Sequence, residues 1–426
     1  MSDKLIILMV DGVSADHYQR DAGRFPHFRS LERRGFRVEA LRSEVLGTSL
    51  PGRTSMLTGA TAATSGVYGN KIWDPQYAQF RYANPDDIRV PTLPALAKAA
   101  GKRVANIGFG MIRPEDTHLF RPPWWAGAFI QRARDAAPEP ADAAWLRVAL
   151  HATEAEFDAA CAAAGVPATL PSIDLSSEAQ RAFFGLMADQ QMIDWAGVVA
   201  SGPNSPDLIT VEFLMTDTIQ HDMGYRSELS QWAVMQADLA LGRLLERLRA
   251  AGVEDEWNIA VMSDHGHSPV ERALRPGRII PETRFQCEGQ CLLVAPRDAE
   301  ELARITAALA AYEAHPYPND CIPPELRDQV VIFVAPDGTS FEEEPPPGTP
   351  EDEVLGAPKA ISSHGLRPGL PGDDRFALFA GPKVPAGRIE TAEAVQVAPT
   401  CAALLGLPLE PFSAAPIFTP HSVPVA

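Results

Sequence analysis

Carboxylate and imidazole side chains recur at the ends of apolar runs in this sequence. Asp217 and His221 are four residues apart, so on a helical turn they share one face and suit a common metal ion. Asp264 and His265 form a second acid–imidazole pair, and the glycine after them lets the backbone turn sharply. The full set of such groups is three carboxylates and three imidazoles: Asp11, Asp217, His221, Asp264, His265 and His364.

A hydroxyl-rich segment, residues 47–59, supplies a candidate nucleophile. The pattern predicts a loop that leads into a short apolar helix. A hydroxyl at a helix N-terminus is stabilised by the helix dipole and by free backbone N–H groups. With Ser49 or Thr48 as a seventh donor, the set is too large for one tetrahedral ion but suits two. The mixture of Asp and His favours Zn²⁺, with Mn²⁺ possible. Two such cations about 3.5–4 Å apart are a standard arrangement for displacement at phosphorus.

The elements that must position these residues are alternating strands and helices, which predict an α/β fold with a mainly parallel central sheet and helices on both faces. Each candidate ligand lies just beyond a predicted strand, or just before one through a loop, so all can converge on one sheet edge. The predicted strands are Leu5–Val10, Arg103–Ile107, Leu208–Phe213, Asn258–Met262, Gln290–Ala295, Val330–Val334 and Phe376–Ala380. The predicted helices are Thr92–Ala100, Leu229–Ala251, Ala299–Ala314 and Ala398–Leu405.

Residues 1–426 are expected to form a single catalytic domain with two insertions. Residues 110–200 interrupt the alternation with Pro- and Ala-rich, helix-prone sequence, which is typical of a cap on the substrate side. Residues 296–356 are the second, smaller insertion or cap segment, and they contain an acidic, Pro-rich loop at Glu342–Glu353.

Charge and composition exclude several classes of protein. Lys and Arg total 37 against 55 Asp and Glu, a net charge of −18, which argues against nucleic acid as a partner. No apolar run is long enough to span a bilayer, so no membrane association is expected. The N-terminus reads as a buried strand and the five cysteines are scattered, which together predict a cytoplasmic protein. A small anionic substrate, a phosphate or phosphonate, would be met by bound metal ions. Nothing in the sequence predicts the oligomeric state.

In order and spacing, these residues resemble the alkaline phosphatase superfamily and, within it, the nucleotide pyrophosphatase/phosphodiesterase branch. The matching segments are Val10-Asp11-Gly12, Ser49-x-Pro51 with Leu57-Thr58-Gly59, residues 69–75, Asp217-x-x-x-His221, Asp264-His265-Gly266, His364-Gly365 and residues 398–408. The resemblance implies an alkaline phosphatase-like fold and two zinc sites. One would be held by Asp217, His221 and His364, and the other by Asp11, Asp264 and His265 together with the nucleophile oxygen.

The same resemblance assigns the catalytic roles. Ser49 lies nine residues before Thr58, where the family has its nucleophile, and Thr48 next to it is the alternative. Asn70 matches the side chain that donates to a phosphoryl oxygen. The implied activity is hydrolysis of phosphodiester or pyrophosphate bonds in a nucleotide-like small molecule through a phosphoryl-serine intermediate. A phosphonate hydrolase similar to phosphonoacetate hydrolase, a phosphomonoesterase and a non-catalytic metal-binding protein are the alternatives.

Further residues carry more local expectations. Arg53, Lys71 and Trp73 are candidates for binding substrate, and an ion pair on the helix is the other interpretation of Arg53. Ser49-x-Pro51-x-Arg53 also resembles the signature of sulfatases, but sulfatases open with paired aspartates that bind one Ca²⁺, whereas Gly12 follows Asp11 here. His267 is expected to be an exposed loop residue, with a hydrogen-bonding role beside the metal as the alternative.

Overall fold

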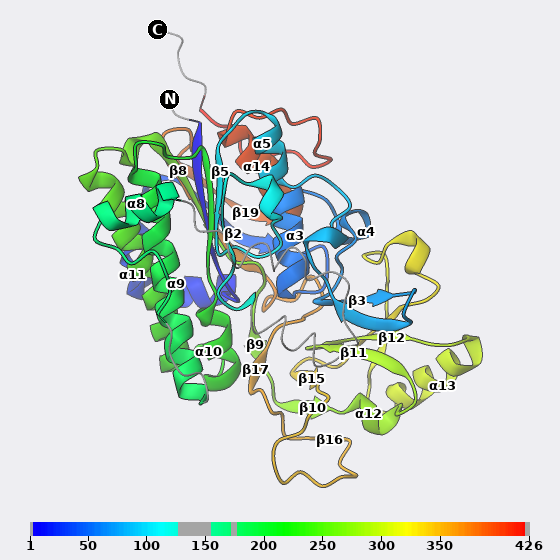
Figure 1. The fold of residues 1–426 in the computed structure, drawn as a ribbon. Coiled ribbons are helices and arrows are strands. Elements are labelled where there is room, and N and C mark those ends of the chain that lie inside the picture. The colour runs from blue at the N-terminus through cyan, green and yellow to red at the C-terminus, as the bar shows by residue number, and fades with distance from the viewer. Residues whose placement is uncertain (1–2, 127–154, 172–176, 422–426) are drawn as a thin grey trace.

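The computed structural model describes residues 3–126, 155–171 and 177–421, and an eight-stranded sheet lies at its centre (Figure 1). The strand order is β19-β2-β18-β8-β1-β7-β5-β6. All neighbouring strands are parallel except for β18, which runs antiparallel to both β2 and β8. The strands are β1 (Lys4–Val10), β2 (Phe36–Arg42), β5 (Val104–Ile107), β6 (Leu119–Arg121), β7 (Leu208–Phe213), β8 (Trp257–Met262), β18 (Arg375–Ala380) and β19 (Gly387–Glu393). The predicted α/β class with a mainly parallel sheet is confirmed.

Side chains of β1 alternate between two hydrophobic cores, because successive residues of a strand point to opposite faces. Leu5 and Met9 pack in one core, Ile6 and Val10 in the other. The first core is covered by α3 (Ser49–Thr58), α5 (Leu93–Ala99) and α14 (Val397–Leu404). The second is covered by α1 (Ala15–Asp21), α2 (Pro26–Arg34), α8 (Ala155–Ala163), α9 (Glu178–Ser201) and α11 (Glu228–Ala250). Figure 1 shows these helices on the two sides of the sheet.

Two predicted strands lie outside the central sheet. The apolar runs beginning near Gln290 and Val330 form β12 (Cys291–Ala295) and β14 (Val331–Val334). They belong to a four-stranded antiparallel sheet, ordered β11-β12-β14-β13, together with β11 (Arg284–Glu288) and β13 (His315–Tyr317). Helix α13 (Ala299–Ala310) covers this small sheet and contributes Ile305 and Leu309 to a third core. An apolar run indicates a buried strand, but it does not say which sheet will bury it.

The segment 110–200 is only partly an addition to the core. Its described residues include β6, an edge strand of the central sheet, and α9, which packs against β7 and α11. Ile193 and Ala196 of α9 are fully buried in the second core, so this helix is part of the layer that covers the sheet. Residues 127–154 and 172–176 of the predicted insertion lie outside the described residues.

Among the described residues, no helix is both long enough and apolar enough to cross a membrane.

Candidate active site

The predicted ligands meet at one edge of the central sheet because of the strand directions. β1, β7 and β8 are mutually parallel neighbours, so their carboxyl ends lie side by side. Asp11 follows β1, Asp264 follows β8, and helix α10 (Met215–Met223), which carries Asp217, follows β7. β18 is antiparallel and starts at this same edge, so the loop before it brings His364 there as well. All six predicted metal ligands therefore converge.

Asp11, Asp264 and His265 form the first cluster, and all three side chains are buried. His265 Nε2 lies 3.1 Å from Asp11 Oδ1 and 3.9 Å from Asp264 Oδ1. His265 Nδ1 is 2.8 Å from the backbone oxygen of Gly266, to which it can donate its hydrogen. This bond leaves Nε2 as the ring nitrogen facing the carboxylates, as a metal ligand requires.

The second cluster surrounds Asp217 and contains one imidazole more than predicted. His221 Nε2 lies 3.4 Å from Asp217 Oδ2, while His364 Nε2 lies 3.9 Å from Asp217 Oδ1. His267 is also there, with Nε2 at 3.5 Å from Asp217 Oδ1 and a fully buried side chain. The expectation that His267 is an exposed loop residue is wrong. Since His267 lies only two residues beyond His265, the tight turn that buries one imidazole carries the other into the site.

Ser362 orients two of these imidazoles, and no sequence signal had singled out its role. Its backbone oxygen is 3.0 Å from His221 Nδ1, and its hydroxyl is 2.6 Å from His267 Nδ1. Ser362 begins β17 (Ser362–Ser363), which pairs with β9 (Ser268–Pro269). The short ladder therefore fixes the loop so that both Nε2 atoms face Asp217.

The electrostatics of the clusters fit bound cations. Asp11 Oδ1, Asp217 Oδ1 and His267 Nε2 are buried and have no hydrogen-bond partner among the described residues, which is costly unless a cation or water binds them. Burial and the neighbouring Asp264 carboxylate raise the pKa of Asp11 to about 7. Burial alone would lower the pKa of His265, but Asp264 and Asp11 raise it to about 10. The site thus favours positive charge, and its oxygen and nitrogen donors fit zinc or manganese.

Ser49 presents its hydroxyl to the first cluster. It begins helix α3, and its Oγ lies 3.2 Å from His265 Nε2. Thr48 precedes the helix with a fully buried side chain whose hydroxyl has no hydrogen-bond partner. Of the two candidate nucleophiles, Ser49 is the one placed beside the predicted ligands, at the positive end of the helix dipole.

Asn70 lies next to the nucleophile. Its Oδ1 accepts the N–H of Leu50 at 2.8 Å, so its amide nitrogen remains available as a donor. The backbone N–H groups of Asn70 and Lys71 donate in turn to the carboxylate of Glu288 at 3.1 and 3.0 Å. Glu288 carried no recognisable motif, since its partner Asn70 is 218 residues away in sequence.

Arg53 does not face a substrate pocket. Its side chain is only 1% exposed, and its guanidinium lies 2.6 Å from Asp11 Oδ2, 3.2 Å from Asp264 Oδ2 and 3.3 Å from Glu212 Oε2. Trp125 Nε1 donates to the other oxygen of Glu212 at 2.5 Å. The substrate-binding prediction for Arg53 is therefore wrong. Arg53 does form ion pairs, but with carboxylates outside its own helix rather than on the helix as expected.

The other two predicted substrate residues lie in different surroundings. Trp73 is 8% exposed, packs edge-on against Phe80 and donates its indole N–H to Gln329 at 3.1 Å, so it is a core residue. Its predicted contact with substrate is wrong, because the hairpin of β3 (Lys71–Asp74) and β4 (Gln79–Tyr82), which follows Asn70, buries this ring. Lys71 is partly exposed, with its ammonium over the ring of Tyr82, and its contact with substrate stays a prediction.

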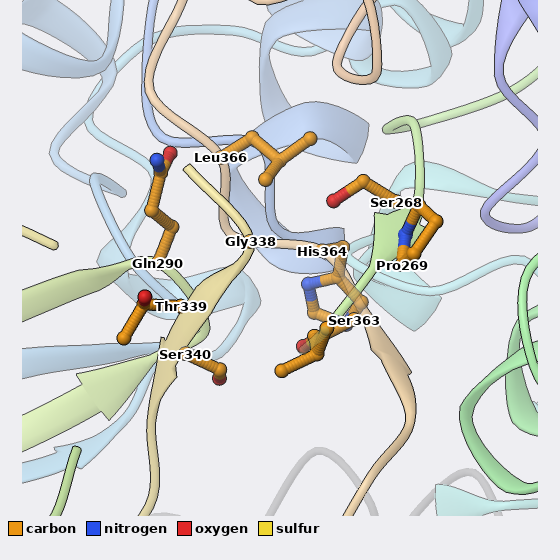
Figure 2. Close-up of a pocket in the computed structure, with 10 residues that line it drawn as sticks. Ser268, Pro269, Gln290, Gly338, Thr339, Ser340, Ser363, His364 and Leu366 are labelled. Carbon is orange, nitrogen blue, oxygen red and sulfur yellow. The ribbon is translucent and has the colours of Figure 1, made fainter. Parts of the chain in front are cut away.

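A small pocket opens beside His364. Figure 2 shows His364 and Ser363 on one side of it, with Gln290 and Thr339 on the other. Its free volume of about 10 Å³ accommodates about one water molecule. Part of its wall, Gly338–Ser340, comes from the segment predicted as a smaller cap. That segment therefore borders a predicted metal ligand, His364.

Comparison with known proteins agrees with this fold and identifies the family. Two structures of the murine ectonucleotide pyrophosphatase/phosphodiesterase 5 are 17% identical to this chain, with a TM-score of 0.67 and 97% of each chain covered. One of them is an inactive variant in complex with AMP. The human ectonucleotide pyrophosphatase/phosphodiesterase 5 is 15% identical, with a TM-score of 0.66 and the same coverage. The family described as type I phosphodiesterase/nucleotide pyrophosphatase matches residues 5–344, most of the chain. The chain therefore belongs to the type I phosphodiesterase/nucleotide pyrophosphatase family and is a hydrolase.

Proposed function

We propose that this hydrolase cleaves phosphodiester or pyrophosphate bonds of a nucleotide-like small molecule, with Ser49 as the nucleophile and two zinc ions, or manganese, as cofactors. The observation that carries the proposal is the position of the Ser49 hydroxyl. It lies 3.2 Å from His265 Nε2, at the start of a helix and beside the predicted ligands. AMP bound to the murine relative supports a nucleotide as the substrate class.

Two ligand sets are assigned to the two ions. Asp11, Asp264 and His265, which form one candidate ligand group, would hold one ion together with the Ser49 oxygen. Asp217, His221 and His364 would hold the other, since Asp217 forms one candidate group with His221 and another with His364. When bound, the ions supply the positive charge that lowers the pKa of a coordinated hydroxyl or water and stabilises a departing oxygen.

The side chains and backbone supply the remaining steps. The oxygen of Ser49 attacks phosphorus in line, the new O–P bond forms, and the bond to the leaving group breaks. Asn70 donates through its amide nitrogen to an oxygen of the phosphoryl group, and the N-terminus of α3 adds the positive end of its helix dipole. A preorganised donor of this kind contributes roughly 3–4 kcal/mol to transition-state stabilisation. Water then cleaves the phosphoryl-serine bond and frees Ser49.

The test compares wild-type protein with Ser49→Ala on four substrates in the presence of Zn²⁺ or Mn²⁺. These are bis-p-nitrophenyl phosphate, a mononucleotide p-nitrophenyl ester, p-nitrophenyl phosphate and phosphonoacetate. We expect the diesters to be hydrolysed fastest and Ser49→Ala to abolish turnover. The metal content of the variant, measured by elemental analysis, should stay close to two equivalents per chain, because six other ligands remain.

Thr48→Ala is the matched control, since this hydroxyl is adjacent, fully buried and joined to neither cluster by a hydrogen bond among the described residues, and the variant should keep turnover. A clear preference for the monoester or for phosphonoacetate would overturn the substrate assignment. Full activity of Ser49→Ala would overturn the nucleophile.

A further inference from the structure

Glu288 reaches the active site from the small antiparallel sheet. It is the last residue of β11 and only 4% exposed. Its Oε2 accepts the backbone N–H of Asn70 and its Oε1 accepts that of Lys71. A carboxylate that accepts two consecutive N–H groups fixes the direction of both peptide units, and such charge-assisted bonds are stronger than neutral ones.

The contact continues through Asn70 to the nucleophile. Asn70 Oδ1 accepts the N–H of Leu50, the residue after Ser49. The backbone of Asn70 is therefore held from one side by Glu288 and its side chain from the other by the first turn of α3. A shift of the Asn70 peptide would move the amide nitrogen relative to the Ser49 hydroxyl.

The end of β11 also abuts the turn that carries a predicted metal ligand. A Cβ atom added to Gly289 would lie 1.8 Å from the backbone oxygen of His364, and one added to Gly365 would lie 1.8 Å from that of Glu288. The two backbone segments are thus as close as glycine permits. This close contact fixes the position of the Glu288 backbone relative to the turn that carries His364.

We propose that Glu288 is a positioning residue that sets the position of the Asn70 amide relative to Ser49. Through this residue, the small antiparallel sheet would affect the rate of catalysis. This inference rests on the proposed function, in which Asn70 donates to the phosphoryl group. In this proposal Glu288 touches no reacting atom, and its side chain acts on the reaction through the Asn70 backbone that it binds.

The first variant is Glu288→Gln, which keeps the shape of the side chain but offers one acceptor oxygen in place of two. Because burial raises the pKa of Glu288 to about 7, the assay is run at alkaline pH, where the carboxylate is ionised. Small misplacements of a catalytic donor cost up to about 100-fold in rate, so we expect kcat for bis-p-nitrophenyl phosphate to fall by about 10- to 100-fold. KM and metal content should change little.

Asp238→Asn is the matched control for loss of a buried carboxylate. Asp238 is 1% exposed and accepts the backbone N–H groups of His27 and Phe28 at 3.2 and 2.7 Å, far from the site. Its variant should lose thermal stability to a similar degree but keep kcat. If Glu288→Gln fails to fold, Glu288→Asp, which keeps the charge on a shorter side chain, takes its place.

A double-mutant cycle with Asn70→Ala separates positioning from a general structural effect. If Glu288 acts through Asn70, the double variant should be no slower than Asn70→Ala alone. Losses that multiply would overturn the inference, as would a kcat for Glu288→Gln equal to that of Asp238→Asn. If Asn70→Ala itself keeps full kcat, Asn70 is not the donor to the phosphoryl group that the proposed function requires. That result would overturn this inference as well.

Discussion

At the scale of single residues, Arg53 shows how a cation can support a site without touching substrate. Its guanidinium is shared by Asp11, Asp264 and Glu212, and each of the two metal-site aspartates turns its Oδ2 to it. One oxygen of Asp11, Oδ1, is thereby left facing His265. Arg53 therefore leaves Oδ1 of Asp11 for a metal ion, and it compensates a concentration of buried negative charge.

The variant Arg53→Met tests this supporting role. Removing one partner of a buried ion pair leaves uncompensated charge, so we expect the free energy of unfolding to fall by about 3–5 kcal/mol. Thermal or denaturant unfolding measures this loss. Arg113→Met is the control, because Arg113 forms a partly exposed pair with Asp86, and such pairs contribute about 0–1 kcal/mol. An Arg53→Met variant with unchanged stability and a raised KM would instead show that Arg53 binds substrate.

At the scale of elements, helix α3 packs directly on the loop that carries Asp264. A Cβ added to Gly52 would lie 2.0 Å from the backbone oxygen of Asp264, so only glycine allows this approach. Gly52→Ala must move the helix or the loop. Overpacking of this kind costs about 1–3 kcal/mol. We expect the variant to melt at a lower temperature and to lose kcat, because Ser49 and the first ligand cluster shift relative to each other.

Gly23→Ala is the control for the glycine substitution, because no atom lies within 4 Å of the added Cβ. Its melting temperature and kcat should stay near those of the wild type. Equal behaviour of the two variants would mean that the helix and the loop can separate without consequence for the site.

The same scale explains how far the sequence predicts this fold. β1, β7 and β8 are buried along almost their whole length, so each is a continuous apolar run, and Asp11, Asp217 and Asp264 could be recognised by their place after such runs. β19 was not predicted, because it is an edge strand with mostly exposed residues and no apolar run.

The supporting residues of the site could not be predicted in the same way. Glu212, Glu288 and Ser362 act on partners 159, 218 and 141 residues away, and nothing in their neighbourhood distinguishes them from ordinary strand residues. Arg53 and Trp73 were assigned to substrate because the sequence gives their spacing from Ser49 and Asn70 but not the direction of their side chains. Local sequence patterns thus predict the candidate ligands and nucleophile, whereas the residues that position them are determined by tertiary contacts.

At the scale of the whole molecule, the candidate metal centre joins segments from Asp11 to His364 at one edge of the sheet. Bound ions would cross-link these segments in the folded state only, so they stabilise it by mass action, by about 2.7 kcal/mol per site at a hundredfold excess over Kd. Removal of metal with a chelator should therefore lower the melting temperature, and added Zn²⁺ should restore it. Asp217→Asn is the matched variant, because Asp217 belongs to two of the three candidate ligand groups, and it should respond much less to chelator. A wild-type protein that loses its metal without any fall in melting temperature would show that the ions bind the unfolded chain as tightly as the folded one, and it would overturn the proposed cross-link.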